Sequence, residues 1–438
     1  MYLMNMREED VTRRLLDQRA ELLAPKQQRI IPREAVGSYR HLLQSSLVKV
    51  VMGPRRSGKS VFCTQLLGDT PFVYANFDDE LLAGMQAAEL DLVVQAWSQT
   101  QGECATVLLD EVQNVAGWEL FVNRLQRGGR NVLVTGSNSQ LLSSELASHL
   151  TGRHRTLEVM PFSFREYLSY RDTRGGTGPR STAELGAMRR HLADYLATGG
   201  FPETYREPEP RRYLLDLYQS VIARDIAFRH RIRNVATLRH IAQYLFAHLG
   251  TRVTHHKLRK IFSAGSVHTV QNYLGYLQES YLIFVLDRFS RKAKERHTAP
   301  RKVVPVDTGM ARAIGGSADN PVGYLYETVV ALELFRRRSW TDAMEVQYWQ
   351  DRSGREVDFI VSVDSRPVSL IQACFDPSDP DTMNRERRAL LAGAADTGCR
   401  NLLVVTDSHE TETQADGRTI RFVPLWRWLL DTASHLPT

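Results

Sequence analysis

One short stretch, GPRRSGKS at residues 53–60, constrains the fold of this chain more than any other. It fits the pattern G-x-x-x-x-G-K-[ST] at every fixed position, with a β-branched run before it and a helical pattern after it. In that context glycines turn backbone N–H groups toward phosphate oxygens, and the following helix adds the positive end of its dipole. The residues predicted to line this phosphate site are Gly53, Pro54, Arg55, Arg56, Ser57, Gly58, Lys59, Ser60 and Val61.

Two side chains of this loop carry its chemistry. Lys59 is expected to reach the β- and γ-phosphates of a nucleotide, and the Ser60 hydroxyl is expected to ligate Mg²⁺. A second motif, TVLLDEVQ, ends an apolar strand with Asp110 and Glu111. Asp110 is predicted to hold Mg²⁺, directly or through water, and Glu111 to act as the general base on the attacking water. ATP and Mg²⁺ are therefore the expected ligands.

Two further segments supply candidates for the same reaction. In NVLVTGSNSQLL a buried strand ends in small polar residues, so Asn138, or alternatively Ser137, is a candidate for orienting the lytic water. A turn-forming role is the competing interpretation of both residues. Arg153 precedes the next strand and lies far from its own phosphate loop in this pattern, so it is a candidate arginine finger for a neighbouring subunit, with Arg155 as the alternative.

Taken together, these motifs resemble those of an AAA+ ATPase. The phrases IIPRE, MGPRRSGKS, LTGRHRTLEVMPFSFREYL and GGFPE narrow the resemblance to prokaryotic, archaeal-type AAA+ ATPases that carry a C-terminal domain of unknown function. The resemblance implies a ring oligomer, with a hexamer as the expected size, and nucleotide sites between subunits. It also implies that the IPR and GGxPE phrases lie near the adenine, which concerns Ile31, Pro32, Gly200 and Pro202.

The chain is long enough for several domains. At 438 residues it exceeds one ordinary core, and alternating strands and helices predict a parallel sheet covered by helices on both faces in the first half. The predicted α/β architecture is an AAA+ P-loop core with a helical lid, a winged-helix domain and a PD-(D/E)xK-like domain. The expected boundaries are an N-terminal helical segment at 1–45, the core at 46–170, the lid at 171–230, the winged helix at 231–300 and the C-terminal domain at 301–438.

The middle of the chain is strongly basic. Between Thr251 and Lys302 there are eleven lysines or arginines against three acidic residues. Two helices followed by two extended pieces around a basic turn are typical of a winged helix, whose second helix enters a DNA groove. The alternative is a domain for protein contacts with solvated arginines. The candidate DNA contacts are His268, Thr269, Gln271 and Asn272 on the helix, and Arg291, Lys292, Lys294 and Arg296 on the wing.

The C-terminal part has the skeleton of a PD-(D/E)xK nuclease but not its full set of catalytic residues. A helix with Glu327 and Glu333 precedes a predicted hairpin that carries Asp358. The next strand reads Gln372-Ala373-Cys374 where that chemistry needs an acid and a lysine. Glu333, Glu356 and Asp358 remain as acids that could group together. An inert, structural or docking domain is nevertheless the favoured interpretation.

The functional hypothesis follows from these parts. A Mg²⁺-dependent ATPase ring would bind duplex or branched DNA and remodel or translocate it, with junction migration as one such activity. The alternative is an ATP-dependent switch or scaffold in signalling or defence, and a weaker rival retains nuclease activity. The composition, with 42% hydrophobic and 24% charged residues, is that of a globular protein, and four scattered cysteines fit a reducing cytoplasm.

Overall fold

The computed structural model describes residues 7–24, 30–102, 104–138, 152–173, 175–176, 178, 181–316 and 322–431. The chain forms two compact units, Met1–Met160 and Pro161–Thr438, and each is described by itself. The first unit ends ten residues before the core boundary expected at 170, and the finer domain boundaries remain predictions. Among the described helices, none has the length and apolar character needed to cross a membrane.

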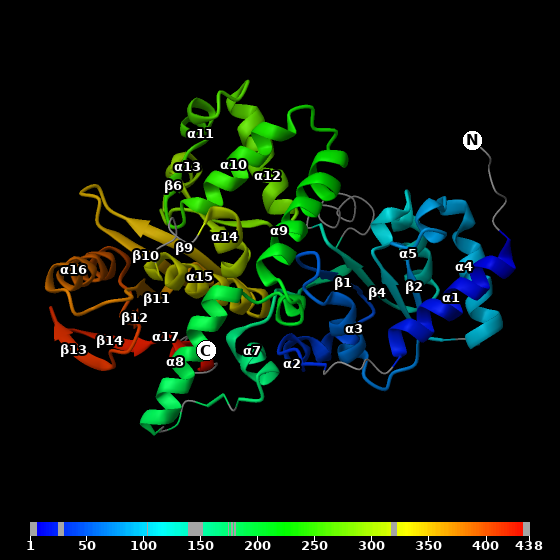
Figure 1. Cartoon of the computed structure of the whole chain (residues 1–438), viewed down its shortest axis with the longest axis horizontal. Helices are drawn as coiled ribbons and strands as arrows, with labels where there is room; N and C mark the ends of the chain where they lie inside the picture. The colour runs from blue at the N-terminus through cyan, green and yellow to red at the C-terminus, as the bar shows by residue number, and fades with distance from the viewer. Residues whose placement is uncertain are drawn as a thin grey trace. The chain divides into compact units, whose positions relative to one another are not determined.

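A five-stranded parallel sheet forms the centre of the first unit, with the strand order β2-β3-β4-β1-β5. The predicted parallel α/β core is therefore confirmed (Figure 1). The strands are β1 (Val48–Met52), β2 (Phe72–Asn76), β3 (Thr106–Asp110), β4 (Asn131–Gly136) and β5 (His154–Glu158). The helices are α1 (Glu8–Leu23), α2 (Ala35–Tyr39), α3 (Lys59–Leu67), α4 (Leu90–Gln101) and α5 (Trp118–Arg127), with short 3₁₀ turns η1 (Arg40–Gln44), η2 (Leu82–Gly84), η3 (Ala87–Glu89) and η4 (Val112–Asn114).

Strand alternation determines which helices cover the sheet. Val48 and Val50 of β1 belong to the core formed with α1, α4 and α5, whereas α3 packs on β1 and β4. Successive side chains of a strand point to opposite faces, so these helices cover both faces of the sheet. The carboxyl ends of β1, β4 and β3 are adjacent in the strand order, so the loops that follow them meet at one edge. Ligand sites of open parallel sheets form at this edge.

The second unit begins with a helical layer. It contains α7 (Phe164–Tyr170), α8 (Thr182–Thr198), η6 (Pro202–Tyr205), α9 (Pro210–Ser220) and the π-helix η7 (Val221–Phe228), and α14 (Thr308–Gly315) packs against α8 and α9. Gly309 permits the close approach of α14, because a Cβ at this position would lie 2.2 Å from the Thr198 carbonyl oxygen. This packing fixes the position of the Gly199-Gly200 turn that follows α8.

A group of helices with a small sheet follows in the chain (Figure 1). The three-stranded antiparallel sheet has the order β6-β8-β7. The elements, in chain order, are α10 (Val235–Ala247), β6 (Arg252–Val253), α11 (His255–Ile261), α12 (Val267–Glu279), β7 (Ile283–Leu286), α13 (Ala293–Thr298) and β8 (Arg301–Pro305). The Ser266 hydroxyl caps α12 by accepting from the Thr269 N–H at 3.0 Å, as the sequence predicted. The expected simple basic turn between β7 and β8 is wrong, because residues 293–298 form α13.

The last part of the chain forms a six-stranded sheet of order β13-β14-β12-β11-β10-β9. Strands β9, β10 and β11 are antiparallel neighbours, β11, β12 and β14 run parallel, and β13 is antiparallel to β14. Helix α16 packs on β10 and β11, and α15 packs against β9, β11 and β8. The bounds are α15 (Val322–Trp340), β9 (Met344–Gln350), β10 (Glu356–Val363), β11 (Arg366–Ala373), α16 (Pro380–Thr397), β12 (Leu402–Thr406), β13 (Thr411–Ala415), β14 (Arg418–Pro424) and α17 (Leu425–Leu430).

Candidate active site

The loop between β1 and α3 has the backbone shape of a phosphate cradle. Gly53 and Gly58 have φ angles of 150° and 87°, which favour glycine, and α3 begins at Lys59. A Cβ on Gly53 would lie 2.1 Å from the Val159 carbonyl oxygen, so no other residue fits there. The Ser57 hydroxyl is buried and has no hydrogen-bond partner among the described residues. The cradle therefore fits a ligand with acceptor oxygens.

Lys59 is buried inside this cradle, with 6% of its surface exposed. Its ammonium lies 3.2 Å from the Gly53 carbonyl oxygen and 3.1 Å from that of Pro54. A carboxylate oxygen of Glu111 lies 3.7 Å from the same nitrogen. The loop carbonyls thus hold the ammonium directly beneath the cradle, where it faces the acidic end of β3.

Ser60 and Asp110 meet at the edge of the sheet. The Ser60 hydroxyl donates to Asp110 Oδ2 at 2.6 Å, Tyr74 donates to the same oxygen at 3.1 Å, and Thr135 donates to Oδ1. Burial, and then the negative charge of Glu111, raise the pKa of the Asp110 carboxyl, while the Ser60 and Thr135 hydrogen bonds and Lys59 oppose that shift. A hydroxyl beside a carboxylate is an oxygen ligand set that suits Mg²⁺. These residues therefore fit the metal that the loop motif implies.

Glu111 lies at the junction of β3 and β4. Its φ of 51° is a left-handed conformation, and its N–H donates to the Thr135 hydroxyl at 3.1 Å. The Ser137 hydroxyl donates to Glu111 Oε2 at 3.2 Å, and the Gln113 amide donates to the same oxygen. Ser137 therefore touches the candidate base, while Asn138 is buried at the end of the same segment. The role of Asn138 in orienting water stays a prediction.

Arg33 is the residue of this site that the sequence motifs did not assign. Its guanidinium donates to the Ser57 carbonyl at 2.7 Å and also to the Met160 carbonyl, so it connects the cradle to the end of the first unit. Gln65 of α3 bonds the Arg33 N–H at 2.7 Å and the Ile31 carbonyl at 2.8 Å. Arg33 is the arginine of the IPR phrase, which was the sequence signal for this role. The structure shows that its side chain is 6% exposed. Ile31 is buried, whereas Pro32 is exposed.

Gly200 and Pro202 belong to the other unit, so the predicted adenine pocket that combines them with Ile31 and Pro32 stays a prediction. Packing inside the second unit already requires Gly200 to be a glycine. A Cβ there would lie 2.4 Å from the Phe162 carbonyl oxygen, and the Gly200 N–H donates to the Asp307 carboxylate at 2.5 Å. Burial raises the pKa of Asp307 to about 6, against hydrogen bonds from Gly200, Met310 and Gly309.

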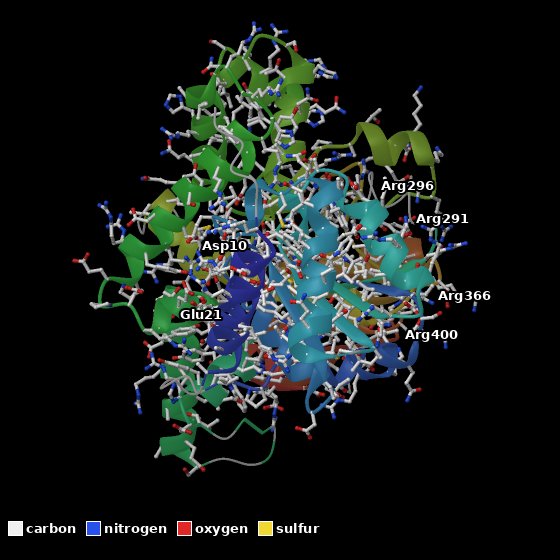
Figure 2. The ribbon with its side chains drawn as sticks, turned by 90° about the vertical axis from the view of Figure 1, so that its right-hand side faces the viewer. Asp10, Glu21, Arg291, Arg296, Arg366 and Arg400 are labelled. Carbon is white, nitrogen blue, oxygen red and sulfur yellow. The ribbon has the colours of Figure 1, made fainter. Side chains whose placement is uncertain are left out.

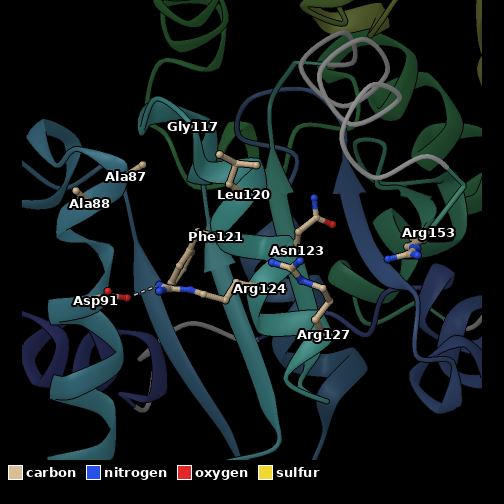
Figure 3. A pocket seen from close by; sticks show the side chains of 10 residues that line it. All are labelled: Ala87, Ala88, Asp91, Gly117, Leu120, Phe121, Asn123, Arg124, Arg127 and Arg153. Atoms are coloured by element: carbon tan, nitrogen blue, oxygen red, sulfur yellow. Dashed lines mark hydrogen bonds and ion pairs between the residues drawn. The ribbon is translucent and has the colours of Figure 1, made fainter.

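Arg153 lies at the opposite edge of the first unit's sheet from the phosphate loop. It immediately precedes β5, and its carbonyl accepts from the Val48 N–H at the start of β1. A five-residue strand spans about 16 Å, so this side chain is far from its own Lys59. Arg153 is exposed and borders a pocket of about 640 Å³ together with Arg124 and Arg127 of α5 (Figure 3). Arg155 is also exposed, on β5 itself.

The predicted DNA contacts divide into two groups. On α12, His268 and Gln271 are exposed, Thr269 and Asn272 are half-buried, and the Asn272 amide lies 3.2 Å from His268 Nδ1. These four residues share the first turns of one helix.

In the second group, Arg291 comes two residues before α13 and Arg296 belongs to α13 (Figure 2 labels both side chains). The Arg291 guanidinium donates to the Asp396 carbonyl at 3.4 Å, and the Lys292 ammonium lies 3.4 Å from Glu295. Lys294 and Arg296 are exposed. Arg291 therefore contacts α16 of its own unit, which a purely solvated wing residue would not do.

A buried lysine gathers three of the C-terminal acids. Lys302 is 2% exposed, and its ammonium lies 2.7 Å from Glu327, 2.6 Å from Glu356 and 3.2 Å from Asp358. Burial raises the pKa of Glu327 to about 7, although Lys302 opposes this shift. The cluster lies in a cleft of about 1030 Å³. Sequence motifs missed Lys302, because it belongs to β8 rather than to the six-stranded sheet.

Glu333 does not join this cluster, and the expectation that it would group with Glu356 and Asp358 is wrong. Its carboxylate instead lies 2.9 Å from Arg165, 2.6 Å from Arg336 and 3.0 Å from Arg337. Gln372, at the position expected to hold an acid, accepts from the Asp358 N–H at 3.2 Å and donates to Glu386. The Gln372 amide therefore hydrogen-bonds the Asp358 backbone and the Glu386 carboxylate, and it adds no negative charge of its own.

Comparisons with known proteins agree with the geometry of the first unit. A family profile described as an AAA domain matches residues 45–168. Two profiles described as domains of unknown function, DUF8612 and DUF4143, match residues 189–320 and 322–428. An uncharacterized protein of Methanocaldococcus jannaschii is 31% identical over 399 residues, which covers 87% of this chain and 88% of that protein. The chain belongs to the same family as this archaeal protein.

Other similarities are more distant. A Haemophilus influenzae protein is 26% identical over 399 residues, covering 87% of this chain and 94% of its own length. The Walker-type ATPase of Pyrococcus abyssi has a TM-score of 0.42 at 15% identity, and covers 67% of this chain and 98% of its own. The Aeropyrum pernix ORC1 protein in complex with DNA has a TM-score of 0.33 at 13% identity, covering 68% of this chain and 96% of its own. The AAA domain supports an AAA-type ATPase core, and this family implies nucleotide binding.

Proposed function

We propose that this AAA-family chain hydrolyses ATP with Mg²⁺ and couples turnover to the binding and remodelling of duplex or branched DNA. The observation that carries the proposal is the junction of three strand ends, where Lys59, Ser60 and Asp110 lie around one cradle with Glu111 beside them. The candidate general base therefore lies beside the phosphate-binding residues, at the carboxyl edge of the sheet where open α/β proteins bind ligands.

Each residue of the junction has a separate task in the proposed reaction. The loop N–H groups and Lys59 bind the phosphates and hold the transferred group in line. Ser60 and Asp110 hold Mg²⁺, which when bound neutralises phosphate charge. Glu111 accepts the proton of the attacking water, while Ser137 orients the Glu111 carboxylate through its hydrogen bond. Arg33 fixes the Ser57 carbonyl and so keeps the cradle in shape.

We further propose that the nucleotide site is completed by a second subunit in a ring, with a hexamer as the expected size. Arg153 cannot serve its own phosphate loop. It lies at the amino end of the sheet, beside the start of β1, whereas the loop follows the carboxyl end of β1. An exposed arginine at the opposite edge instead suits the phosphates of an adjacent subunit. Arg127 adds positive charge near Arg153, whereas Arg124 pairs with Asp91.

The DNA-binding part of the proposal rests on residues 235–305. The order α10, β6, α11, α12, β7, α13, β8 with an antiparallel sheet supports a winged helix whose wing contains the short helix α13, and in which α12 enters the major groove. Polar side chains on its first turns, led by His268 and Gln271, are exposed to make contacts. Lys294 and Arg296 are exposed to contact phosphates from the segment between β7 and β8.

We propose that the C-terminal domain does not cleave DNA. The order α15, β9, β10, β11, α16, β12 supports the PD-(D/E)xK-like fold. However, the Lys302 ammonium lies among Glu327, Glu356 and Asp358, which are the carboxylates that a metal ion would need. A cation supplied by the chain itself makes a catalytic metal there unfavourable. Mg²⁺- or Mn²⁺-dependent plasmid cleavage that disappears in Asp358→Ala would contradict this assignment.

The decisive experiment measures ATP turnover with and without duplex, single-stranded and branched DNA over a range of salt concentrations. Stimulation that weakens as salt rises is the expected result, because phosphate contacts release counterions. A double variant, His268→Ala with Gln271→Ala, should lose duplex stimulation but keep basal turnover. Turnover that no DNA alters, together with the absence of salt-sensitive DNA binding, would favour the alternative of a nucleotide-dependent switch or scaffold.

A further inference from the structure

The surface of the second unit carries one exposed aromatic side chain in a strongly basic turn. Phe228 ends the π-helix η7 and has 83% of its surface exposed, more than any other large apolar side chain among the described residues. The following residues read Arg229-His230-Arg231-Ile232-Arg233. The exposed ring is accessible to a ligand, and π-helical turns are frequent at functional sites. This turn, residues 228–233, is absent from the candidate DNA contacts described above.

The basic turn is held in a defined conformation. The Ile232 N–H donates to the Ala227 carbonyl at 2.9 Å, which closes its base, and the Arg231 N–H donates to the Phe228 carbonyl at 3.3 Å. Arg231 has a φ of 49°, so the chain reverses sharply at this residue. Phe228 and Arg231 therefore lie across a single hydrogen-bonded turn, so the aromatic residue and the arginine belong to the same short segment.

The basic turn is also anchored to α12. The His230 ring stacks on Tyr276 with centroids 3.7 Å apart and an interplanar angle of 17°, and its Nε2 lies 3.5 Å from Glu279. Tyr273 of α12 donates to the Asn234 carbonyl at 3.3 Å. His230 thus points inward while Phe228 stays exposed. Since Tyr276 and Glu279 belong to the second half of α12, the turn lies beside that half, away from the end that carries His268 and Gln271.

The charge of the turn specifies the partner. Arg231 and Arg233 are exposed, and in the described part of the chain no acidic side chain pairs with either of them. The acids nearest in sequence on either side of the turn, Asp225 and Glu279, are buried. An exposed aromatic ring flanked by unpaired guanidinium groups matches a nucleic acid with unpaired bases, because the ring stacks on a base while arginines contact phosphates. The interior of a DNA duplex offers no free base face to the ring, because each base pair is covered by its neighbours.

We propose that Phe228, with Arg231 and Arg233, is a second nucleic-acid contact that binds an unpaired base in a single-stranded or branched DNA. It extends the proposed DNA function, but it does not require α12 to read a duplex. The contact would explain a preference for a DNA with exposed bases without a sequence preference, because every base has a face that can stack.

The test compares the full chain binding a fluorescein-labelled oligodeoxythymidine of about 20 nucleotides with a blunt duplex of the same length. Phe228→Ala should weaken single-strand binding about tenfold and leave duplex binding unchanged, because one stacked base is lost. Phe228→Trp should retain the affinity. Arg231→Gln with Arg233→Gln should reduce the salt slope of single-strand binding by about 1.4, or about 0.7 for each phosphate. Leu16→Ala is the control, because Leu16 is 44% exposed on α1 of the other unit.

Single-strand affinity that Phe228→Ala leaves unchanged would overturn the inference. A change in self-association without a change in DNA affinity would also overturn it, since the ring would then bind protein. If duplex binding depends on His268 and Gln271 while single strands do not bind, only this inference fails. If neither kind of DNA binds, the proposed DNA function fails with it.

Discussion

At the scale of single residues, the candidate active site depends on two contacts made by neighbouring residues of one loop. Ser60 reaches Asp110 at 2.6 Å, and Lys59 reaches Glu111 at 3.7 Å. The consecutive residues Lys59 and Ser60 thus face different acids. Ser60 faces Asp110, the candidate Mg²⁺ ligand, and Lys59 faces Glu111, the candidate general base. This arrangement predicts different defects for substitutions of the two acids.

Substitution of Glu111 should slow hydrolysis strongly while nucleotide binding persists. Glu111→Gln keeps the shape of the side chain but cannot accept a proton, so turnover should fall by about 10² to 10⁴. Lys59→Ala should instead lose binding together with turnover, because the buried ammonium faces the cradle. Fluorescent ATP binding and phosphate release, measured side by side, check both outcomes. Normal hydrolysis by Glu111→Gln would remove this residue from the mechanism.

Glu333 predicts a specific loss of stability in acid. Burial alone would raise the pKa of this carboxyl, but Arg165, Arg337 and Arg336 outweigh burial and lower the pKa to about 2. A lowered native pKa stabilises the fold above the unfolded pKa of about 4.3, and this contribution disappears as the pH falls toward 2. The free energy of unfolding of the wild type should therefore approach that of Glu333→Gln by about 1.4 kcal/mol per pH unit below about pH 4.

Urea unfolding of both proteins between pH 7 and pH 3 measures this difference. Glu410→Gln is a suitable control, because Glu410 pairs with Arg427 at the surface and is half exposed. A difference between wild type and Glu333→Gln that stays constant with pH would show that the three arginines do not hold a charged carboxylate.

At the scale of elements, strand β8 connects two sheets. Through Lys302 it pairs with β6 in the three-stranded sheet and contacts acids of α15 and β10. Neighbouring Arg301 pairs with Asp287 near the surface. Because adjacent residues of a strand point to opposite faces, one side chain of β8 enters the acid cluster and the next stays outside it.

Removing the buried cation should weaken the second unit strongly. Lys302→Met leaves three carboxylates without their shared partner, and breaking a buried charge pair costs about 3 to 5 kcal/mol. The matched variant Arg301→Met breaks a partly exposed pair and should cost less than about 1 kcal/mol. Denaturant unfolding of the two variants checks the contrast. Equal stabilities would mean that Lys302 is not the internal cation of the cluster.

At the scale of the whole molecule, the two edges of the parallel sheet carry complementary halves of the proposed site. The phosphate loop lies at the carboxyl edge and Arg153 precedes β5 at the amino edge. A closed ring brings unlike edges of adjacent subunits together, because its interfaces are heterologous. Arg153 and Lys59 of one chain would then serve different sites.

Mixing two inactive variants should restore activity. Arg153→Ala keeps its phosphate loop, and Lys59→Ala keeps its arginine, so an equal mixture should regain roughly a quarter of the interfaces. Turnover of each variant alone and of the mixture, over a range of protein concentrations, provides the measurement. Arg155→Ala is the control, since Arg155 is exposed two residues after Arg153, on β5. Normal turnover by Arg153→Ala would exclude it as the finger.

The sequence predicted short-range features well. The phosphate loop, the acids that end β3 and the Ser266 cap of α12 are contiguous patterns, and their geometry follows from local backbone preferences. Several local elements were not predicted, among them β13 and α13. Strand β13 reads Thr-Glu-Thr-Gln-Ala, a polar edge strand stabilised by backbone pairing with β14, and α13 lies within a segment too charged to show helical periodicity.

The sequence by itself determined that a strand, a glycine-rich loop and a helix form a nucleotide cradle with two acids nearby. Only the tertiary structure decided which charges meet. Lys302 finds Glu327 and Asp358 across separate elements, whereas Glu333, on the same helix as Glu327, finds Arg165 instead. Periodicity can identify the buried positions of a helix, but the partner of a buried charge depends on which elements pack beside it.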